Sequence, residues 1–324
     1  MVDERTWSRR GVLSAAVGTA FAGCSTGGDE TTAPENRTTS GQPRTTTGQS
    51  KTTQATTSVP PPTPDSNGEV RDVVFRQTPE RDLKLDLYLP ESGGDHPFFV
   101  FAHGGGWIFG NKGERPMFDA LTADGYAVAD IQYRLSTEAK YPAAVRDTVA
   151  AVKWVRSNAS QFDIDGSTGV LAGYSAGAHL ATLVGYAPEH DTFQPTEFKP
   201  NVSAAVDAVV GYSGPYDLTT PASEGSTLVE EFFGEDASDE TLAEGSPVTH
   251  VDSSDPPTLL LHGTDDQTVP YRSATVLSAA LEDAGVPVEL FTADGAGHGM
   301  INNPEWREQT LPTQQQFLDD HLQS

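Results

Sequence analysis

Residues 68–324 are predicted to fold as an α/β domain with a mainly parallel, doubly wound sheet. Short apolar runs alternate there with longer segments of helical spacing, and this alternation favours parallel strands with helices on both faces. The run 97–102 is apolar except for its leading proline, as expected for a strand covered on both sides. A Gly-x-Ser-x-Gly pattern at 173–177 follows the apolar run 170–172 and precedes a helix-like stretch, which indicates a strand-to-helix turn.

The individual elements follow from apolar runs for strands and from helical spacing for helices. Strands are expected at residues 70–75, 83–89, 97–102, 126–131, 169–173, 204–212, 257–262 and 286–291. Helices are expected at residues 116–123, 142–159, 178–186, 273–284 and 304–322. Pro142 suits the first turn of the helix expected at 142–159. Gly285 directly follows the helix expected at 273–284 and ends it. The acidic, Gly- and Ser-rich segment 213–248 is expected to form a small cap.

The first 67 residues are expected to lie outside this domain. Residues 1–23 resemble a twin-arginine export signal, with Arg9 and Arg10 before an apolar stretch too short to span a bilayer. They end in a segment that resembles a lipoprotein processing box, and Cys24 is the only cysteine in the chain. Residues 24–67 are rich in Thr, Ser and Pro and are predicted to be a disordered tether. We therefore expect an exported protein held at the outer face of the cytoplasmic membrane by a lipid on Cys24.

The charge balance excludes several kinds of partner. The chain has 46 acidic against 20 basic residues, a formal net charge of -26. Nucleic acid is not an expected partner, because binding phosphates requires the opposite sign. An anionic membrane surface would also repel the domain, so attachment depends on the lipid. The pattern resembles that of proteins secreted by extreme halophiles such as haloarchaea, in which concentrated salt screens self-repulsion.

Ser175, at the centre of the Gly-x-Ser-x-Gly pattern, is the candidate nucleophile. A serine hydroxyl needs a base within hydrogen-bond reach, and His298 is our candidate because it lies in a loop of small residues just after a buried strand. The other histidines weighed for this role fit less well, since they lie in polar, terminal or cap segments or before the acid loop: His190, His250, His262 and His321. By proximity alone, Asp265 and Asp266 both qualify as the carboxylate that orients the imidazole.

The sequence His-Gly-Gly-Gly-Trp at 103–107 is the candidate oxyanion loop. A tetrahedral oxyanion needs two or three backbone N–H donors aimed at one point, and residues without side chains allow the chain to present them. We expect Gly105, Gly106 and Ala176 to supply these donors. Trp107 and Tyr174 are the candidates for substrate binding, although Trp107 also suits ordinary packing. This chemistry requires no metal and no cofactor, and none is predicted.

Residues 133–135 (Tyr-Arg-Leu), 141–144 (Tyr-Pro-Ala-Ala) and 173–177 carry a family resemblance. From about residue 70 to 322 the chain resembles α/β-hydrolase esterases of the hormone-sensitive-lipase type and their acetylxylan and feruloyl esterase relatives. The resemblance implies the α/β-hydrolase fold and a Ser-Asp-His triad in that chain order. The related pattern H-G-x-x-D-x-x-V-P places the acid on Asp266. Tyr174 and Ala178 depart from the usual residues of that type, which bears on the substrate and not on the triad.

These features together predict a serine carboxylic-ester hydrolase. Its expected substrates are short acyl esters or acetyl and feruloyl esters linked to polysaccharide. The acidic, compact cap segment disfavours a long-chain lipase, which would carry a larger apolar lid. An amidohydrolase resembling kynurenine formamidase is the alternative enzyme, and a surface-tethered binding protein without activity is the alternative outside enzymes.

The charge balance predicts a dependence on salt. Like-charge repulsion opposes the compact state, and its range falls from about 10 Å at 0.1 M salt to about 3 Å at 1 M. We expect both the unfolding midpoint and ester hydrolysis to rise with NaCl or KCl into the molar range. Thermal unfolding followed by circular dichroism at 0.1 M and 2 M NaCl checks this. Equal stability and activity at the two concentrations would contradict adaptation to high salt.

Overall fold

Residues 62–91, 93–113, 115–196, 198–220 and 226–322 are described by the structure, a computed structural model. The predicted export signal, Cys24 and all but the last few residues of the predicted tether lie outside these ranges. Among the described residues, no helix is both long enough and apolar enough to span a bilayer.

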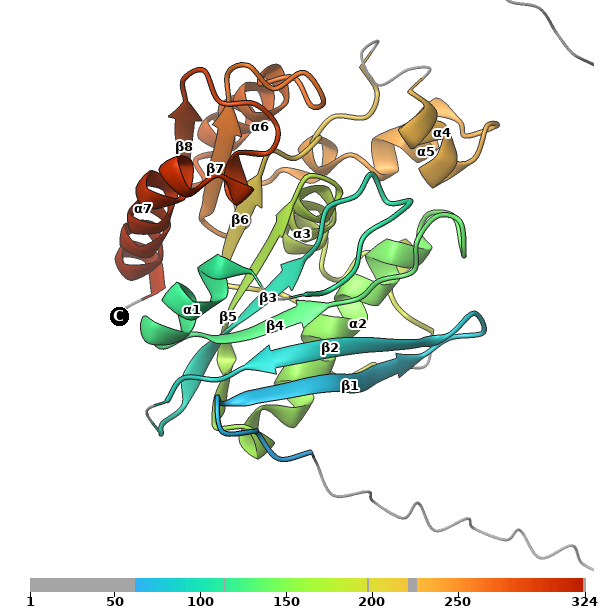
Figure 1. The fold of residues 1–324 in the computed structure, drawn as a ribbon. Coiled ribbons are helices and arrows are strands. Elements are labelled where there is room, and N and C mark those ends of the chain that lie inside the picture. The colour runs from blue at the N-terminus through green and yellow to red at the C-terminus, as the bar shows by residue number, and fades with distance from the viewer. Residues whose placement is uncertain (1–61, 92, 114, 197, 221–225, 323–324) are drawn as a thin grey trace, which may run out of the picture. The chain divides into compact units, whose positions relative to one another are not determined.

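Eight strands of the described residues form one sheet in the order β1-β2-β4-β3-β5-β6-β7-β8 (Figure 1). The strands are β1 (Glu69–Gln77), β2 (Asp82–Tyr88), β3 (His96–Ala102), β4 (Ala127–Ile131), β5 (Ile164–Tyr174), β6 (Ala208–Tyr212), β7 (Thr258–Gly263) and β8 (Val288–Ala293). β1 and β2 are antiparallel at one edge, and the other six strands run parallel. The predicted mainly parallel α/β sheet is confirmed.

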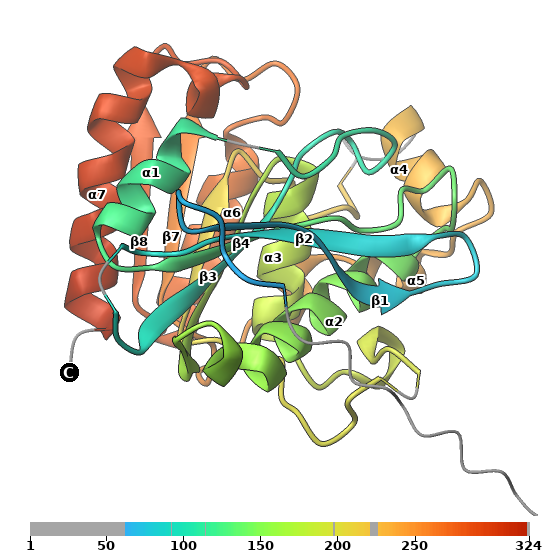
Figure 2. The ribbon, with the colours of Figure 1, turned by 60° about the horizontal axis from the view of Figure 1, so that its bottom comes forward.

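Helices cover both faces of the sheet (Figure 2). The helices of the described residues are α1 (Pro116–Ala123), α2 (Ala143–Asn158), α3 (Ala176–Tyr186), α4 (Thr227–Phe233), α5 (Asp239–Glu244), α6 (Arg272–Ala284) and α7 (Pro304–Leu322). Four short 3-10 turns accompany them, Ala159–Gln161, Asp191–Phe193, Pro247–His250 and Met300–Asn302. One hydrophobic cluster joins the sheet to α2, α3 and α6, and the other joins it to α1 and α7. This three-layer arrangement leaves the carboxyl ends of the parallel strands open for a site.

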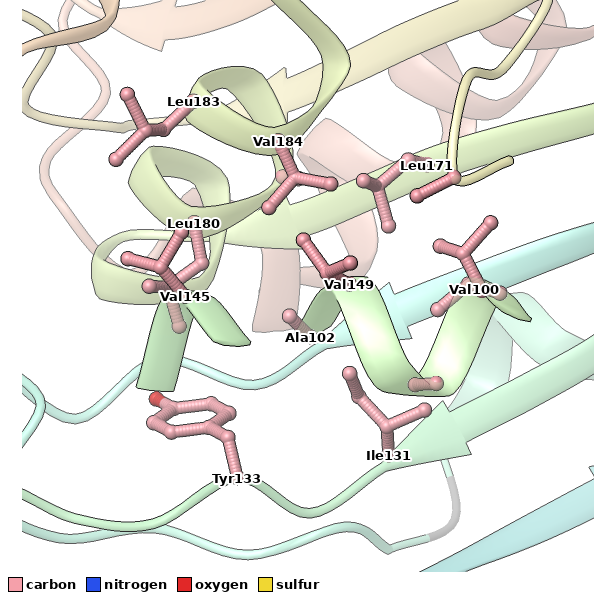
Figure 3. Close-up of a cluster of buried hydrophobic side chains, with 14 of the residues drawn as sticks. Val100, Ala102, Ile131, Tyr133, Val145, Val149, Leu171, Leu180, Leu183 and Val184 are labelled. Atoms are coloured by element: carbon pink, nitrogen blue, oxygen red, sulfur yellow. The ribbon is translucent and has the colours of Figure 1, made fainter. Parts of the chain in front are cut away.

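Strand β3 shows why the sheet is buried on both faces. Phe98, Val100 and Ala102 belong to the cluster under α2 and α3, whereas Phe99 and Phe101 belong to the cluster under α1 and α7. Successive side chains of a strand point to opposite faces, so an apolar run places a hydrophobic residue in each layer. Figure 3 shows the first cluster, where Val100 lies near Val149 of α2 and Leu171 of β5 near Val184 of α3.

The prediction placed the start of β5 five residues too late, since the strand begins at Ile164 and not at residue 169. Two other strands begin two or more residues later than expected, for local reasons. β6 begins at Ala208 and not at residue 204. The N–H of Gly169 in β5 donates to the Asp207 side-chain carboxylate at 2.8 Å. In a continued strand, a backbone carbonyl would accept this N–H. β8 begins at Val288 and not at residue 286, since Pro287 has no N–H to give to the ladder.

Segment 213–248, expected as a small cap, carries the helices α4 and α5 beyond the carboxyl ends of the strands (Figure 1). Tyr141 fastens it to the body, because its N–H donates to Phe232 O at 2.8 Å and its hydroxyl to Glu244 Oε1 at 2.9 Å. Lys140 and Glu231 add an ion pair of 2.9 Å. The cap is therefore attached to the segment that leads into α2.

Candidate active site

Ser175 lies on the sharp turn between β5 and α3. Its backbone has φ 55° and ψ -119°, a conformation that costs a non-glycine residue about 1–3 kcal/mol. Two features hold it there. The Ser175 N–H donates to Tyr212 O at 2.8 Å, and a β-carbon on Gly177 would lie 2.0 Å from Ala102 O of β3. Only glycine at 177 permits this approach of helix and strand, so the turn presents Ser175 at the edge of the sheet.

His298 connects Ser175 to Asp266 by hydrogen bonds. The Ser175 hydroxyl donates to His298 Nε2 at 2.9 Å, and His298 Nδ1–H donates to Asp266 Oδ2 at 2.7 Å. Ser175 is 8 % exposed and Asp266 is 4 % exposed, so the pair of bonds is largely shielded from water. The structure thus brings together the three residues predicted as nucleophile, base and acid.

Asp266 is fixed by its own loop. Its Oδ1 accepts the N–H groups of Thr268 and Val269, each at 2.9 Å, and its Oδ2 lies 3.3 Å from His262 Nε2. Burial opposes ionisation of this carboxyl, but the hydrogen bonds from His262, His298 and the Val269 N–H hold its pKa well below the usual range. Asp266 is therefore ionised and aimed at His298.

Asp265 and His262 have different surroundings from those of the triad residues. The Asp265 side chain is exposed to solvent and contacts neither His298 nor Ser175 in the hydrogen bonds of the described residues. His262 is buried, and its Nε2–H donates to Val269 O at 2.9 Å. His262 thus orders the acid loop, as its position before that loop suggests.

Gly105, Gly106 and Ala176 line the same cavity as Ser175 and His298. Gly105 has φ 126°, and a β-carbon there would lie 1.9 Å from Phe109 O, so the loop requires glycine at this position. Within the described ranges, no hydrogen bond uses the N–H of any of these three residues. Three backbone donors are therefore available beside the Ser175 hydroxyl.

Tyr174 lines the cavity and also supports the base. Its hydroxyl donates to His298 O at 2.9 Å, and the two rings lie 5.2 Å apart. A β-carbon on Gly104 would lie 2.7 Å from the Tyr174 ring, so the tyrosine fills the space between the oxyanion loop and the base loop. The predicted substrate-binding residue is thus also a positioning residue for His298.

Trp107 lines the cavity but is only 3 % exposed. Its ring stacks on Phe232 of the cap at 4.6 Å, and its Nε1–H donates to His179 Nδ1 at 3.3 Å. Ordinary packing therefore accounts for most of its surface, and only a small part of it lines the cavity.

His179, which sequence reasoning missed, joins the oxyanion loop to the cap. Besides accepting the Trp107 N–H, it donates Nε2–H to Gly245 O, at 2.7 Å, at the end of α5. Burial lowers its pKa to about 4, so the ring is neutral at ordinary pH and both nitrogens are used. Its place one helical turn after Ser175 is the signal that could have found it.

The cavity has a volume of about 520 Å³, within the common range of about 300–1,000 Å³ for small-molecule sites. Apolar side chains from the oxyanion loop, the cap, the acid loop and α6 form much of its wall: Trp107, Phe109, Pro215, Leu218, Leu228, Val229, Val269, Pro270 and Val276. In the part of the chain that the structure describes, no cluster of His, Cys, Asp or Glu has the arrangement to hold a metal ion.

The sheet and the turn at Ser175 define an α/β-hydrolase fold. More closely, the BD-FAE family model matches residues 85–281, and the chain belongs to that family. It is 29% identical over 213 residues to Esterase LipC of Mycobacterium tuberculosis, with 63% of this chain and 53% of LipC covered. The chain thus spans about half the length of this curated relative.

Two solved structures have the same fold over most of their length. One is a truncated form of a carbohydrate esterase from gut microbiota, with a TM-score of 0.67, 25% identity, 79% of this chain covered and 100% of that one. The other is the thermophilic esterase Est2 of Thermogutta terrifontis, with a TM-score of 0.69, 26% identity, 80% of this chain covered and 94% of that one.

The contrast between the two neighbouring aspartates gives a matched pair of substitutions. Asp266→Asn should lower kcat for 4-nitrophenyl acetate on the order of 10³-fold or more, because a neutral amide no longer favours the His298 tautomer that accepts the serine proton. Asp265→Asn should change kcat less than about twofold, since that carboxylate is exposed. Circular dichroism of both variants controls for folding. Small and equal losses in the two variants would place the acid elsewhere.

Proposed function

We propose that this protein is a serine carboxylic-ester hydrolase with Ser175 as nucleophile, His298 as general base and acid, and Asp266 as the orienting carboxylate. The observation that carries the proposal is the continuous pair of hydrogen bonds from Ser175 Oγ through His298 to Asp266. A serine hydroxyl becomes a nucleophile when a base takes its proton as the new bond forms. The bonds are in place for that transfer.

In the first half-reaction, Ser175 Oγ attacks the ester carbonyl carbon while His298 Nε2 takes the hydroxyl proton. The imidazolium is stabilised by the ionised Asp266, 2.7 Å from Nδ1. The N–H groups of Gly105, Gly106 and Ala176 then bind the oxyanion that forms on the carbonyl oxygen. The C–O bond to the alcohol breaks as His298 returns its proton to the leaving oxygen, which yields a free alcohol and an acylated Ser175.

The second half-reaction repeats these steps with water. His298 removes a proton from water, the hydroxide attacks the acyl carbon, and the same backbone donors bind the second oxyanion. His298 then protonates Ser175 Oγ as the acyl–oxygen bond breaks. A carboxylic acid leaves and the resting hydroxyl is restored, so the cycle consumes one ester and one water.

The expected substrates are short acyl esters, including acetyl or feruloyl esters linked to polysaccharide. The apolar cavity supports this, as does Phe109, which lines it while 66% exposed and so offers a flat aromatic face to a sugar or phenyl ring. Among the structural relatives, one is a carbohydrate esterase and Est2 has been solved with propionate and with butyrate bound. The cap helices α4 and α5 are short, which favours small acyl groups over long lipid chains.

A panel of substrates and two variants test the proposal. Wild-type protein should hydrolyse 4-nitrophenyl acetate and butyrate, and Ser175→Ala and His298→Ala should each lose on the order of 10⁴-fold or more in kcat, because the triad acts as a unit. Release of 4-nitrophenol is the measurement, and thermal unfolding shows that both variants are folded. Full activity of Ser175→Ala would exclude the mechanism. Faster turnover of N-formylkynurenine than of every ester would favour the formamidase alternative, and no turnover of either would favour a binding protein.

We also propose that the domain acts outside the cell, anchored through Cys24. The support is the sequence alone: the paired arginines, the apolar stretch and the single cysteine at its end. The full chain expressed in its host should sediment with membranes, and Cys24→Ser should leave the protein soluble or the precursor uncleaved. Wild-type protein found free in the medium, cleaved and without lipid, would contradict the anchor.

A further inference from the structure

We infer that Arg272 binds a carboxylate group carried by the ester substrate, and that the enzyme therefore prefers anionic esters. This inference rests on the proposed ester hydrolysis and adds the class of substrate. It starts from the charged side chains of the cavity wall. Besides His298, the described residues that line the cavity include two with charged side chains, Asp217 and Arg272.

Among the described residues, the guanidinium of Arg272 has no hydrogen-bond or ion-pair partner. Its side chain is exposed. Several other basic side chains of this acidic protein are paired with carboxylates. Lys112, for example, lies 2.7 Å from an Asp86 oxygen, and Arg134 Nε lies 2.8 Å from an Asp147 oxygen. Arg272 differs from other basic residues without an ion pair in that it lines the cavity, where a ligand anion would pair with it.

The position of Arg272 at the start of a helix also favours a bound anion. Arg272 is the first residue of α6, and the first turn of that helix contains no acidic residue. The helix dipole places partial positive charge at this end, so a cation there is unfavourable and an anion favourable. A carboxylate bound to Arg272 would therefore interact favourably with both the guanidinium and the helix.

The backbone on both sides of Arg272 is fixed relative to the triad. Before it, Val269 N–H is bonded to Asp266 and the Tyr271 hydroxyl lies 2.6 Å from Thr292 Oγ1. After it, the Ser273 hydroxyl donates to Gly214 O at 3.0 Å and accepts Tyr216 N–H at 2.8 Å. The start of α6 is thus tied to β8 and to the loops after β6 and β7, which holds the backbone of Arg272 in place relative to Ser175.

Among the described residues, no ion pair joins Asp217 to Arg272. Its Oδ1 accepts the N–H and the hydroxyl of Thr219, at 3.0 and 2.7 Å, so this carboxylate is engaged with its own loop. The remaining wall is largely apolar, and a guanidinium beside it can form two parallel hydrogen bonds to a carboxylate. The chemistry that fits is an ester bearing a carboxylate on its acyl or its alcohol part.

Pairs of isosteric esters test the inference and show which part bears the charge. For the acyl side, the pair is the mono-4-nitrophenyl ester of adipic acid and the same ester with a terminal amide. For the alcohol side, the pair is 4-acetoxybenzoate and 4-acetoxybenzamide. The wild-type protein, assayed at one fixed salt concentration, should have kcat/KM about tenfold higher for the anionic member of at least one pair.

Arg272→Gln should remove that preference while it changes kcat/KM for the neutral members less than about twofold. Arg272→Lys should keep part of the preference, since lysine retains the charge but not the planar fork.

Arg307→Gln is the matched control, because Arg307 of α7 also forms no ion pair among the described residues but does not line the cavity. The control should keep the preference. Equal kcat/KM within both pairs for the wild type, or a loss in Arg272→Gln that is the same for anionic and neutral members, would overturn the inference. If the wild type hydrolyses no member of either pair, the proposed ester hydrolysis itself fails and this inference falls with it.

Discussion

The close approach of α3 to β3 is the constraint on which the site depends. The helix begins one residue after Ser175, and Gly177 lies so near the Ala102 carbonyl that no side chain fits between them. Because helix and strand meet there, the chain must turn sharply, and Ser175 takes a backbone conformation that serine ordinarily avoids. Burial of α3 in the core supplies the stability that offsets this local strain. The strained turn presents the hydroxyl to His298 and leaves the N–H of Ala176 available for an oxyanion.

The groups around Ser175 come from distant parts of the chain but are mutually supported. His298 is held from one side by Asp266 and from the other by the Tyr174 hydroxyl, which accounts for a tyrosine before the nucleophile. The oxyanion loop is held by Trp107, whose ring packs on the cap and whose N–H reaches His179 on α3. A residue that packs one part of the site thus positions another, so substitutions at Tyr174 or His179 would act through the residues they support.

The sequence was sufficient for the fold class and for the three triad positions to be proposed, because these depend on local patterns. An apolar run, a Gly-x-Ser-x-Gly turn and a loop after a strand each indicate a structure within about ten residues of chain. The choice of Asp266 over Asp265 rested on resemblance to related sequences, and the structure supplies its physical basis in the two N–H bonds to Asp266 Oδ1. The start of β6 was misplaced because the Asp207 side chain replaces a carbonyl in the ladder, and a side chain in that role leaves no periodic signal.

Contacts between remote segments could not be predicted from the sequence. His179 joins Trp107, 72 residues earlier, to Gly245, 66 residues later, and nothing in the residues beside it indicates either partner. The same holds for Arg272, whose significance lies in the cavity it faces and in the absence of a carboxylate partner among the described residues. In each case, the property that matters is set by the packing of the whole domain.

Covalent labelling tests the central claim, that Ser175 is activated by His298 and Asp266, most directly. A fluorophosphonate phosphonylates a serine only when a neighbouring base removes the hydroxyl proton. Peptide mass spectrometry of the labelled wild-type protein should find one adduct, on Ser175, and its rate of formation should fall at least about 100-fold in His298→Ala. An adduct on another residue, or an undiminished rate without His298, would contradict the claim.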